Sequence, residues 1–173
     1  PLFIEDPVPA ENVAALREVQ RATTLAVALG ERLRSTAEFI PYLQESTCRI
    51  VQPDIGHMGG ISGMKRLGHM ADDYYVTIAP HCCWGPVHSM ASAHVSCALP
   101  NLLLQEDSHL GSDIFEQTVV GGYAFDPGYL DLPEAPGLGV ELSPELIADC
   151  ACDAEKADIA YLQRKLGGES GYD

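Results

Sequence analysis

The sequence is short of positive charge. It contains 10 lysines and arginines against 25 aspartates and glutamates, which gives a formal net charge of −15 and a pI near 4.5. A nucleic-acid site needs a basic face that displaces counterions from the phosphates. The composition therefore excludes nucleic acid as an expected partner.

The sequence also lacks a long apolar segment. No stretch approaches the roughly 18 consecutive apolar residues of a membrane span, and the start, Pro1 to Pro7, has no basic region followed by an apolar run. We therefore expect no membrane partner. The 173 residues, 46% of them hydrophobic and 20% charged, are enough for one globular domain with a hydrophobic core.

Paired cysteine motifs are absent as well. The six cysteines show no C-x-x-C spacing and no secretory signal accompanies them, so neither a disulfide framework nor a zinc ribbon is supported and we expect a reducing, cytoplasmic location. Cys82, Cys83 and His88 lie close together in sequence, but adjacent thiols point in different directions and the spacing matches no common zinc site. We interpret these cysteines as structural or supporting residues.

What the sequence does contain is a repeat of short apolar runs, each followed by a polar residue able to do chemistry. The five runs are Leu2 to Ile4, Thr24 to Leu29, Arg49 to Gln52, Tyr75 to Ala79, and Leu102 to Gln105. The polar residues after them are Glu5, Glu31, Asp54, His81 and Glu106, at intervals of 26, 23, 27 and 25 residues. This step is too long for hairpins and suits a strand, a helix and two loops.

Helix-like segments separate the runs: Glu11 to Arg21, Ser35 to Glu45, Ile61 to Asp72, and Val87 to Leu99. Ser35 followed three residues later by Glu38 is a capping-box signal for the start of the second. Alternating strands and helices with right-handed crossovers predict an α/β fold with a parallel sheet. An open doubly wound sheet is the alternative, but it would expect a Gly-rich phosphate loop, and Gly56 to Gly60 is a poor match. Polar groups at successive strand ends favour a partial TIM-type (β/α) barrel of about five consecutive units, whose strand ends open on one pocket.

Several motifs carry a resemblance to a known family. They are Phe3-Ile4-Glu5-Asp6-Pro7, Gly30-Glu31, Gln52-Pro53-Asp54 with Gly59-Gly60-Ile61, Ala79-Pro80-His81 with Gly85-Pro86, Gln105-Glu106, and Leu132-Pro133 with Pro136-Gly137-Leu138-Gly139-Val140. In their order and spacing, over roughly residues 1 to 142, they resemble the mandelate racemase subgroup of the enolase superfamily. The most similar members are its galactonate dehydratase-like acid-sugar dehydratases.

The resemblance implies a role for each strand-end residue. Glu5 and Glu31 correspond to two of the family's metal-binding carboxylates, and the expected ion is Mg²⁺ or another hard divalent cation. His81 corresponds to the catalytic histidine, Asp54 to the aspartate that orients it, and Glu106 to the glutamate that contacts the substrate carboxylate.

The chemistry of these residue types agrees with those roles. A hydrogen alpha to a carboxylate is a poor acid, because ionisation places a second negative charge beside the first. A divalent cation on oxygen ligands offsets that charge, and a neutral imidazole can accept the proton. We expect dehydration of a sugar acid; racemisation or epimerisation of a 2-hydroxy acid, through the same enediolate, is the alternative.

The resemblance also implies an incomplete barrel. Residues 1–130 correspond to the C-terminal half of a modified (β/α)7β barrel and residues 131–173 to a closing segment with a C-terminal tail or helix. The first barrel strands and the N-terminal capping domain have no counterpart. A half-barrel has open sheet edges that invite association, so we expect a homo-oligomer, and a catalytically incomplete fragment that only pairs with a partner is a further alternative.

The remaining histidines are interpreted as core or surface residues: His57, His69, His88, His94 and His109. Of these, His57 follows Asp54 closely enough to reach the pocket. Trp84 lies in the loop after His81, where a pocket wall and a core contact are equally good interpretations, and no role is assigned to it.

Overall fold

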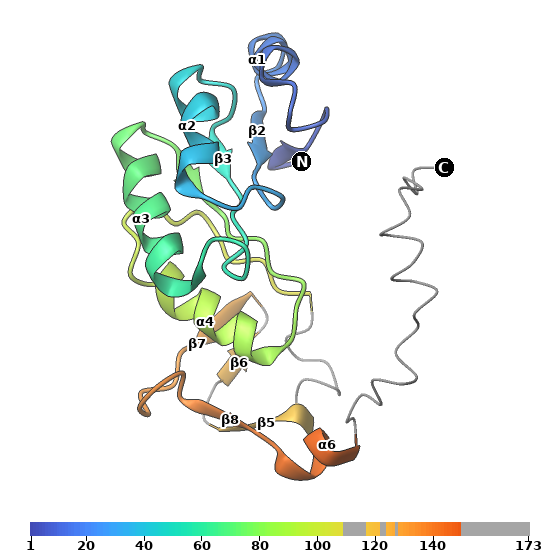
Figure 1. Cartoon of the computed structure of the whole chain (residues 1–173), viewed down its shortest axis with the longest axis vertical. Coiled ribbons are helices and arrows are strands. Elements are labelled where there is room, and N and C mark those ends of the chain that lie inside the picture. Colours follow the sequence, from blue (N-terminus) through green and yellow to red (C-terminus); the bar gives the residue numbers. More distant parts are fainter. Residues whose placement is uncertain (109–116, 122–123, 127, 150–173) are drawn as a thin grey trace.

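The first four apolar runs of the repeat form a parallel β-sheet. The structure, a computed structural model, describes residues 1–108, 117–121, 124–126 and 128–149. Four strands pair in the order β1-β2-β3-β4: β1 (Phe3–Glu5), β2 (Ala26–Leu29), β3 (Ile50–Val51) and β4 (Thr77–Ile78). Every pairing is parallel, so all four carboxyl ends lie at the same edge of the sheet (Figure 1).

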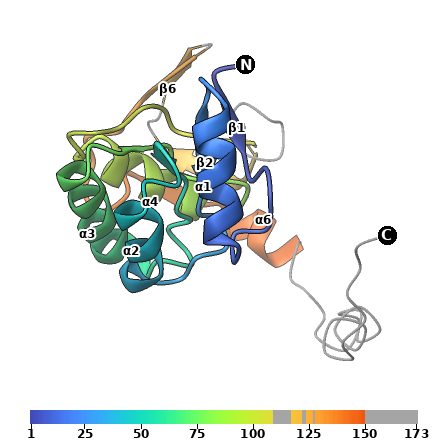
Figure 2. The ribbon, with the colours of Figure 1, turned by 90° about the horizontal axis from the view of Figure 1, so that it is seen from above.

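A helix follows each strand, and the four helices form an arc outside the sheet (Figure 2): α1 (Val13–Ala22), α2 (Thr36–Gln44), α3 (Gly60–Asp73) and α4 (Pro86–Ser96). The predicted capping box is present at α2. The backbone N–H of Glu38 donates to the Ser35 hydroxyl at 3.3 Å, and Glu38 accepts from the backbone N–H of Arg34 at 3.0 Å. Strand, helix and next strand therefore repeat as the sequence predicted, with boundaries within a few residues.

The fifth predicted strand is reduced to a single bridge. Leu102 pairs in parallel with Ile78, and the backbone N–H of Leu103 donates to the Ile78 carbonyl at 2.8 Å. The run from Leu102 to Gln105 has β4 on one side and, among the described residues, no strand on the other. This segment forms one bridge and no continuous ladder with β4, although the backbone N–H of Glu106 still donates to Pro80 O at 3.3 Å.

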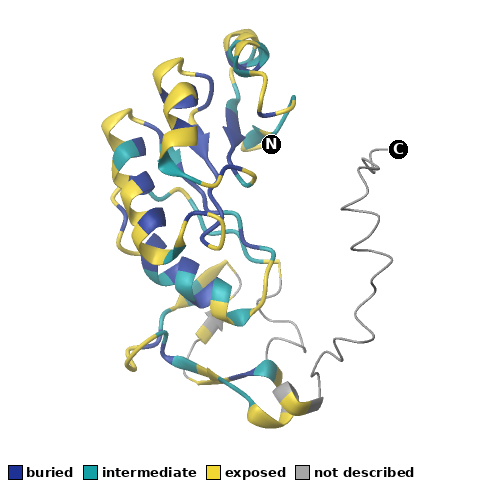
Figure 3. Ribbon diagram, in the orientation of Figure 1, coloured by how far each residue is buried: buried dark blue, intermediate teal, exposed yellow. Residues whose placement is uncertain are grey.

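Alternation of side chains divides the sheet into two apolar faces. Val27, Leu29, Val51 and Ile78 point toward the helices and join the main core with Leu16, Phe39, Met64 and Leu67. The neighbouring positions Ala28, Ile50 and Ala79 point to the other face and pack with Phe3 and Leu104. The helix-facing set is buried, and so are Ala28, Ile50 and Ala79, whereas Phe3 and Leu104 are half-buried (Figure 3). The four parallel strands therefore carry apolar side chains on both faces.

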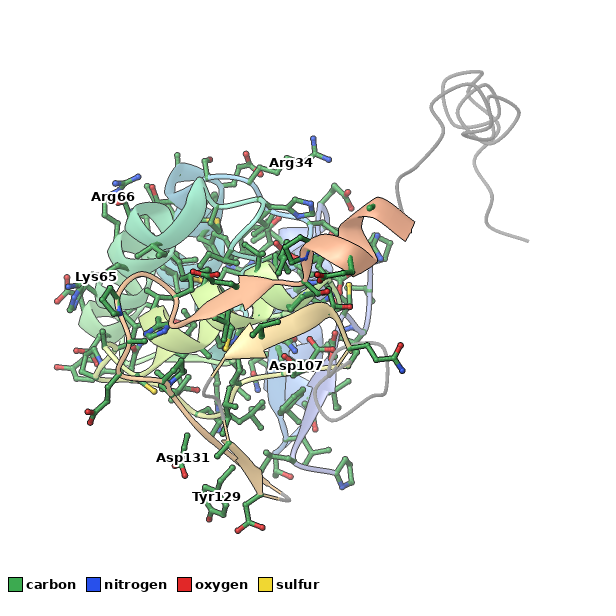
Figure 4. The ribbon with its side chains drawn as sticks, turned by 90° about the horizontal axis from the view of Figure 1, so that it is seen from below. Arg34, Lys65, Arg66, Asp107, Tyr129 and Asp131 are labelled. Atoms are coloured by element: carbon green, nitrogen blue, oxygen red, sulfur yellow. The ribbon has the colours of Figure 1, made fainter. Side chains whose placement is uncertain are left out.

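The C-terminal part adds short antiparallel pairs. Strand β5 (Val119–Gly121) pairs with β8 (Val140–Leu142), and β6 (Ala124–Asp126) pairs with β7 (Tyr129–Asp131). The β6–β7 hairpin projects from the body, with Tyr129 near its turn (Figure 4). Helix α6 (Pro144–Asp149) begins the predicted C-terminal helix, and the rest of that prediction lies outside the described residues. No described helix is long and apolar enough to span a membrane.

Gly30 turns the chain at the end of β2. Its φ is +139°, and a Cβ added there would lie 2.7 Å from the Phe39 ring and 3.1 Å from the backbone nitrogen of Gln52. By simple alternation Glu31 would share the helix-facing side with Leu29. The unusual backbone at Gly30 breaks that alternation and brings Glu31 to the pocket side.

We predict that Gly30→Ala destabilises the chain by roughly 1 to 3 kcal/mol, because the added methyl meets Phe39 in a backbone region that L-residues avoid. Chemical denaturation measures the change. Gly85→Ala is the matched control, since no atom lies within 4 Å of the added Cβ and the Gly85 φ is −70°. Equal stabilities for the two variants would contradict this account of Gly30.

Candidate active site

The predicted site residues follow the strand ends on the non-helical face. Asp54 and His81 continue the alternation that begins at Ile50 and Ala79, and the two residues form a parallel bridge just beyond β3 and β4. Glu106 continues from Leu104 in the same way, and Glu5 is the exposed last residue of β1. The structure therefore brings residues from successive units to one edge of the sheet.

His81 and Asp54 form a hydrogen-bonded pair. His81 Nδ1 lies 2.9 Å from Asp54 Oδ2, and the other ring nitrogen, Nε2, lies 3.5 Å from Oε2 of Glu31. The Asp54 side chain is fully buried, whereas the His81 side chain keeps 15% exposure. A buried carboxylate beside Nδ1 favours the tautomer with its proton there, which leaves Nε2 as the accessible nitrogen.

Asp54 accepts hydrogen bonds from several groups besides His81. Its Oδ1 accepts from the backbone N–H of Gly56 at 2.7 Å and of His57 at 3.3 Å, the loop that turns directly after it. Trp84 Nε1 donates to Oδ2 at 2.7 Å, and His88 Nε2 lies 2.8 Å from Oδ1. The buried carboxylate is thus surrounded by donors from the β3 loop, the β4 loop and α4.

These donors keep Asp54 ionised. Burial alone would raise the pKa of its carboxyl, but hydrogen bonds from His88, His81 and Trp84 outweigh burial and lower the pKa to about 2. The carboxylate therefore holds the Nδ1 proton of His81 without taking that proton itself.

Trp84 and His88 are site residues that the sequence reasoning missed. Both follow the strand end that carries His81, Trp84 in the loop and His88 in the first turn of α4. The usable signal was position: the first turn of a helix after a parallel strand lies near that strand's carboxyl end. His57, singled out for its proximity, contacts the site through its backbone, and its Nδ1 lies 2.9 Å from Glu31 O. His109 lies outside the described residues.

Glu106 is fixed to the loop that carries His81. Its Oε2 accepts from the backbone N–H of Cys82 at 3.0 Å. The preceding residue, Gln105, accepts from Ser92 at 3.0 Å and from Ser96 at 2.7 Å, both on α4. Helix α4 therefore holds the fifth strand end in place, even though only one bridge joins that segment to the sheet.

Acidic groups at the ends of β1 and β2 interact through their charges, and one of them, Glu31, lies beside His81. Burial, then the charges of Glu31 and Glu5, raise the pKa of Asp6, while Arg32 acts against them. The labelled basic side chains Arg34, Lys65 and Arg66 lie at the periphery of the molecule (Figure 4). Carboxylate oxygens are hard ligands, and a divalent cation would relieve the repulsion between neighbouring carboxylates. Glu5 and Glu31 are therefore suited to supply two of the ligands of a Mg²⁺ site. The described residues do not contain a complete set of three metal-binding side chains.

The cysteine cluster is a supporting structure around His88. Cys82 Sγ lies 3.4 Å from His88 Nδ1 and 3.3 Å from the Ser89 hydroxyl, and burial raises the pKa of the Cys82 thiol to about 11. A thiol held neutral is a poor zinc ligand.

Parallel βα units whose strand ends present a histidine, its aspartate partner and several carboxylates define an α/β protein with a candidate site at the carboxyl edge of its sheet. The model of the enolase C-terminal domain-like family matches residues 1–146. The chain belongs to this family.

Among the curated proteins similar to this chain are D-galactonate dehydratases. The chain is 36% identical to the D-galactonate dehydratase of Ralstonia nicotianae over 155 residues, which is 86% of this chain and 41% of that protein. The D-galactonate dehydratase of Variovorax paradoxus is 36% identical over 153 residues, covering 85% and 40%. The chain thus spans about 40% of the length of the curated relatives it matches.

Solved structures agree with the family. A mandelate racemase/muconate lactonizing enzyme-like protein from a Roseovarius species superposes with a TM-score of 0.78 at 40% identity, covering 84% of this chain and 36% of that one. A putative dehydratase from Salmonella enterica gives 0.79 at 30% identity, covering 85% and 37%.

We predict that the stabilising effect of Asp54 disappears in acid. Its pKa is lowered on folding from an ordinary value of 3.8 to about 2, so its contribution is present above pH 4 and is lost as the pH falls toward 2. The lowering corresponds to roughly 2 kcal/mol. The difference in unfolding free energy between wild type and Asp54→Asn should shrink by this amount between pH 6 and pH 2.

Denaturation at a series of pH values measures that difference. Asp73→Asn, which removes an exposed carboxylate at the end of α3, controls for the loss of one negative charge. A wild-type advantage over Asp54→Asn that is the same at pH 6 and pH 2 would contradict the ionised, hydrogen-bonded Asp54.

Proposed function

We propose that this chain is the C-terminal half of a metal-dependent sugar-acid dehydratase, in which His81 removes the proton alpha to a carboxylate. The observation that carries the proposal is the His81–Asp54 pair at adjacent strand ends, with His81 Nε2 only 3.5 Å from Glu31. The D-galactonate dehydratases to which the chain is similar support the substrate class.

His81 acts as the base through Nε2. Asp54 holds the Nδ1 proton and stabilises the positive charge that the ring acquires when Nε2 takes up a proton. The limited exposure of the ring leaves Nε2 open to a substrate, whereas full burial of Asp54 shields its charge from water. A second acid, on a strand outside this chain, would protonate the 3-hydroxyl as it leaves as water, and the proton on Nε2 then passes to solvent.

Glu5 and Glu31 would hold the metal ion from neighbouring strands. A divalent cation there supplies the positive charge that offsets the second negative charge developing on the substrate carboxylate. Glu106, whose side chain accepts from the Cys82 amide in the loop after His81, would hydrogen-bond that carboxylate.

The remaining strands and metal ligand belong to the rest of a barrel. We assign residues 1–130 to the barrel and 131–173 to a closing segment, with the first strands and a capping domain supplied outside this chain. The coverage of about 40% of the relatives' length supports this assignment. The edge of β1 and the segment at Leu102 are the two places where further strands would join, or where a second copy would pair. The location that we propose, a reducing cytoplasm, rests on the lack of paired cysteine motifs in the sequence.

A racemase or epimerase of 2-hydroxy acids would use the same first step. The two reactions diverge after proton removal, because a racemase returns a proton to the opposite face and a dehydratase expels the 3-hydroxyl. Product analysis with sugar acids in deuterated water separates them.

We predict that His81→Asn lowers turnover by at least about 1,000-fold in the polypeptide carrying the complete barrel, because asparagine cannot accept a proton. Product formation and deuterium uptake at C2 are both followed. His69→Asn, at an exposed position on α3, is the matched control and should keep wild-type rates. If His81→Asn also keeps wild-type rates in both assays, His81 is not the base.

We predict that the chain binds Mg²⁺ weakly and that Glu31→Gln lowers the affinity by roughly tenfold, since a charged ligand is lost. Calorimetric titration measures both. Glu134→Gln, which removes an exposed carboxylate between β7 and β8, should bind as wild type does. Tight stoichiometric zinc binding at the cysteines, without a response to Mg²⁺, would overturn the metal assignment.

A further inference from the structure

The second histidine on Asp54 has no part in the reaction described above. We propose that His88 is a positioning residue that donates from Nε2 to Asp54 and thereby holds the carboxylate in the orientation that keeps His81 protonated at Nδ1. This role rests on the proposed function of His81 as the base.

The geometry assigns one carboxylate oxygen to each histidine. His88 Nε2 lies 2.8 Å from Oδ1, and His81 Nδ1 lies 2.9 Å from Oδ2. A carboxylate whose two oxygens are bound by rings on different elements cannot rotate without breaking one of the contacts. His88 therefore limits rotation of the Asp54 carboxylate, and with it the orientation of the His81 ring.

Cys82 lies against the other ring nitrogen of His88. Its buried Sγ is 3.4 Å from His88 Nδ1, 3.3 Å from the Ser89 hydroxyl and 3.9 Å from Asp107 Oδ2, to which the thiol donates. The ionised Asp54 beside Nε2 is the strongest acceptor around the ring and favours the tautomer with its proton on Nε2. Thiol, imidazole and carboxylate thus form a chain from the β4 loop through α4 to the β3 loop.

Helix α4 gives this contact a rigid base. It begins at Pro86, a residue whose fixed φ suits the first helical position, and the fifth strand end is bonded to it through Ser92 and Ser96. His94, further along α4, contacts Leu138 O at 3.0 Å. A side chain in the first turn of a helix held at several points positions a partner better than one on a free loop.

The surroundings of His88 have room for a substituted side chain, so variants can test its role. Its side chain is 14% exposed and lines a cavity of 690 Å³ together with Ile55, Gly56, Val87 and Leu142. Gln places an amide nitrogen near the position of the imidazole Nε2 and keeps a donor, whereas Leu is similar in size and has none. The two variants therefore separate the hydrogen bond from simple packing.

Nitrogen NMR of ¹⁵N-histidine-labelled chain tests the proposal first in the wild type, where no variant has to fold. We expect His88 protonated at Nε2 and His81 protonated at Nδ1 in residues 1–173. A neutral His88 that carries its proton on Nδ1 would overturn the proposal, because Nε2 would then have nothing to donate.

The variants test the consequence for His81. In His88→Leu we expect the Nδ1 signal of His81 to move to a chemical shift that reports a mixture of the two tautomers. In His88→Gln we expect the same signal to lie close to its wild-type position. In the complete barrel, His88→Leu should lower kcat by roughly 10- to 100-fold with KM within about twofold, and His88→Gln should restore most of kcat. A His88→Leu protein with wild-type His81 signals and kcat would overturn the role.

The two kinds of readout separate this inference from the proposed function. If the histidine signals behave as expected while no sugar acid is turned over by the complete barrel, the proposed reaction fails and the coupling of His88 to His81 stands. If turnover is found, and the His81 signals and kcat are the same in His88→Leu and His88→Gln, the reaction stands and the positioning role fails.

Discussion

A buried negative charge at Asp54 is the interaction around which the site is organised. A carboxylate with no exposed surface is costly unless donors surround it, and here the donors come from three separate elements. The turn at Gly56 supplies backbone amides, the loop after His81 supplies Trp84, and α4 supplies His88. The need to satisfy one carboxylate thus ties the ends of β3 and β4 to the start of α4.

The parallel sheet makes this convergence possible. Because side chains alternate along a strand, the residues that pack inward at Ile50 and Ala79 predict the direction of Asp54 and His81 four and two positions later. Glu31 does not follow this alternation. It would face the helices if the backbone did not take its unusual conformation at Gly30. The backbone of one glycine therefore decides whether a carboxylate joins the pocket.

Sequence reasoning could place what depends on local pattern. The apolar runs gave β1 to β4, the capping signal at Ser35 gave the start of α2, and strand-end position indicated His81 and Asp54. Position in the first turn of α4 brings His88 near the pocket, but its contact with Asp54 depends on how α4 rotates against the β3 loop, a property of tertiary packing. The antiparallel pair β5–β8 was missed because neither strand belongs to the repeated runs from which β1 to β4 were predicted.

The several donors on Asp54 also bear on how the His81 ring is held. A carboxylate bound to one ring alone could turn toward other donors or toward water. Here an indole and two imidazoles share its two oxygens, and the low pKa of Asp54 keeps the Nδ1 proton on His81. The His81 ring therefore presents Nε2, the nitrogen that the reaction proposed above would use. The contacts of Asp54 thus bear on the tautomer and orientation of His81 from the side opposite Nε2.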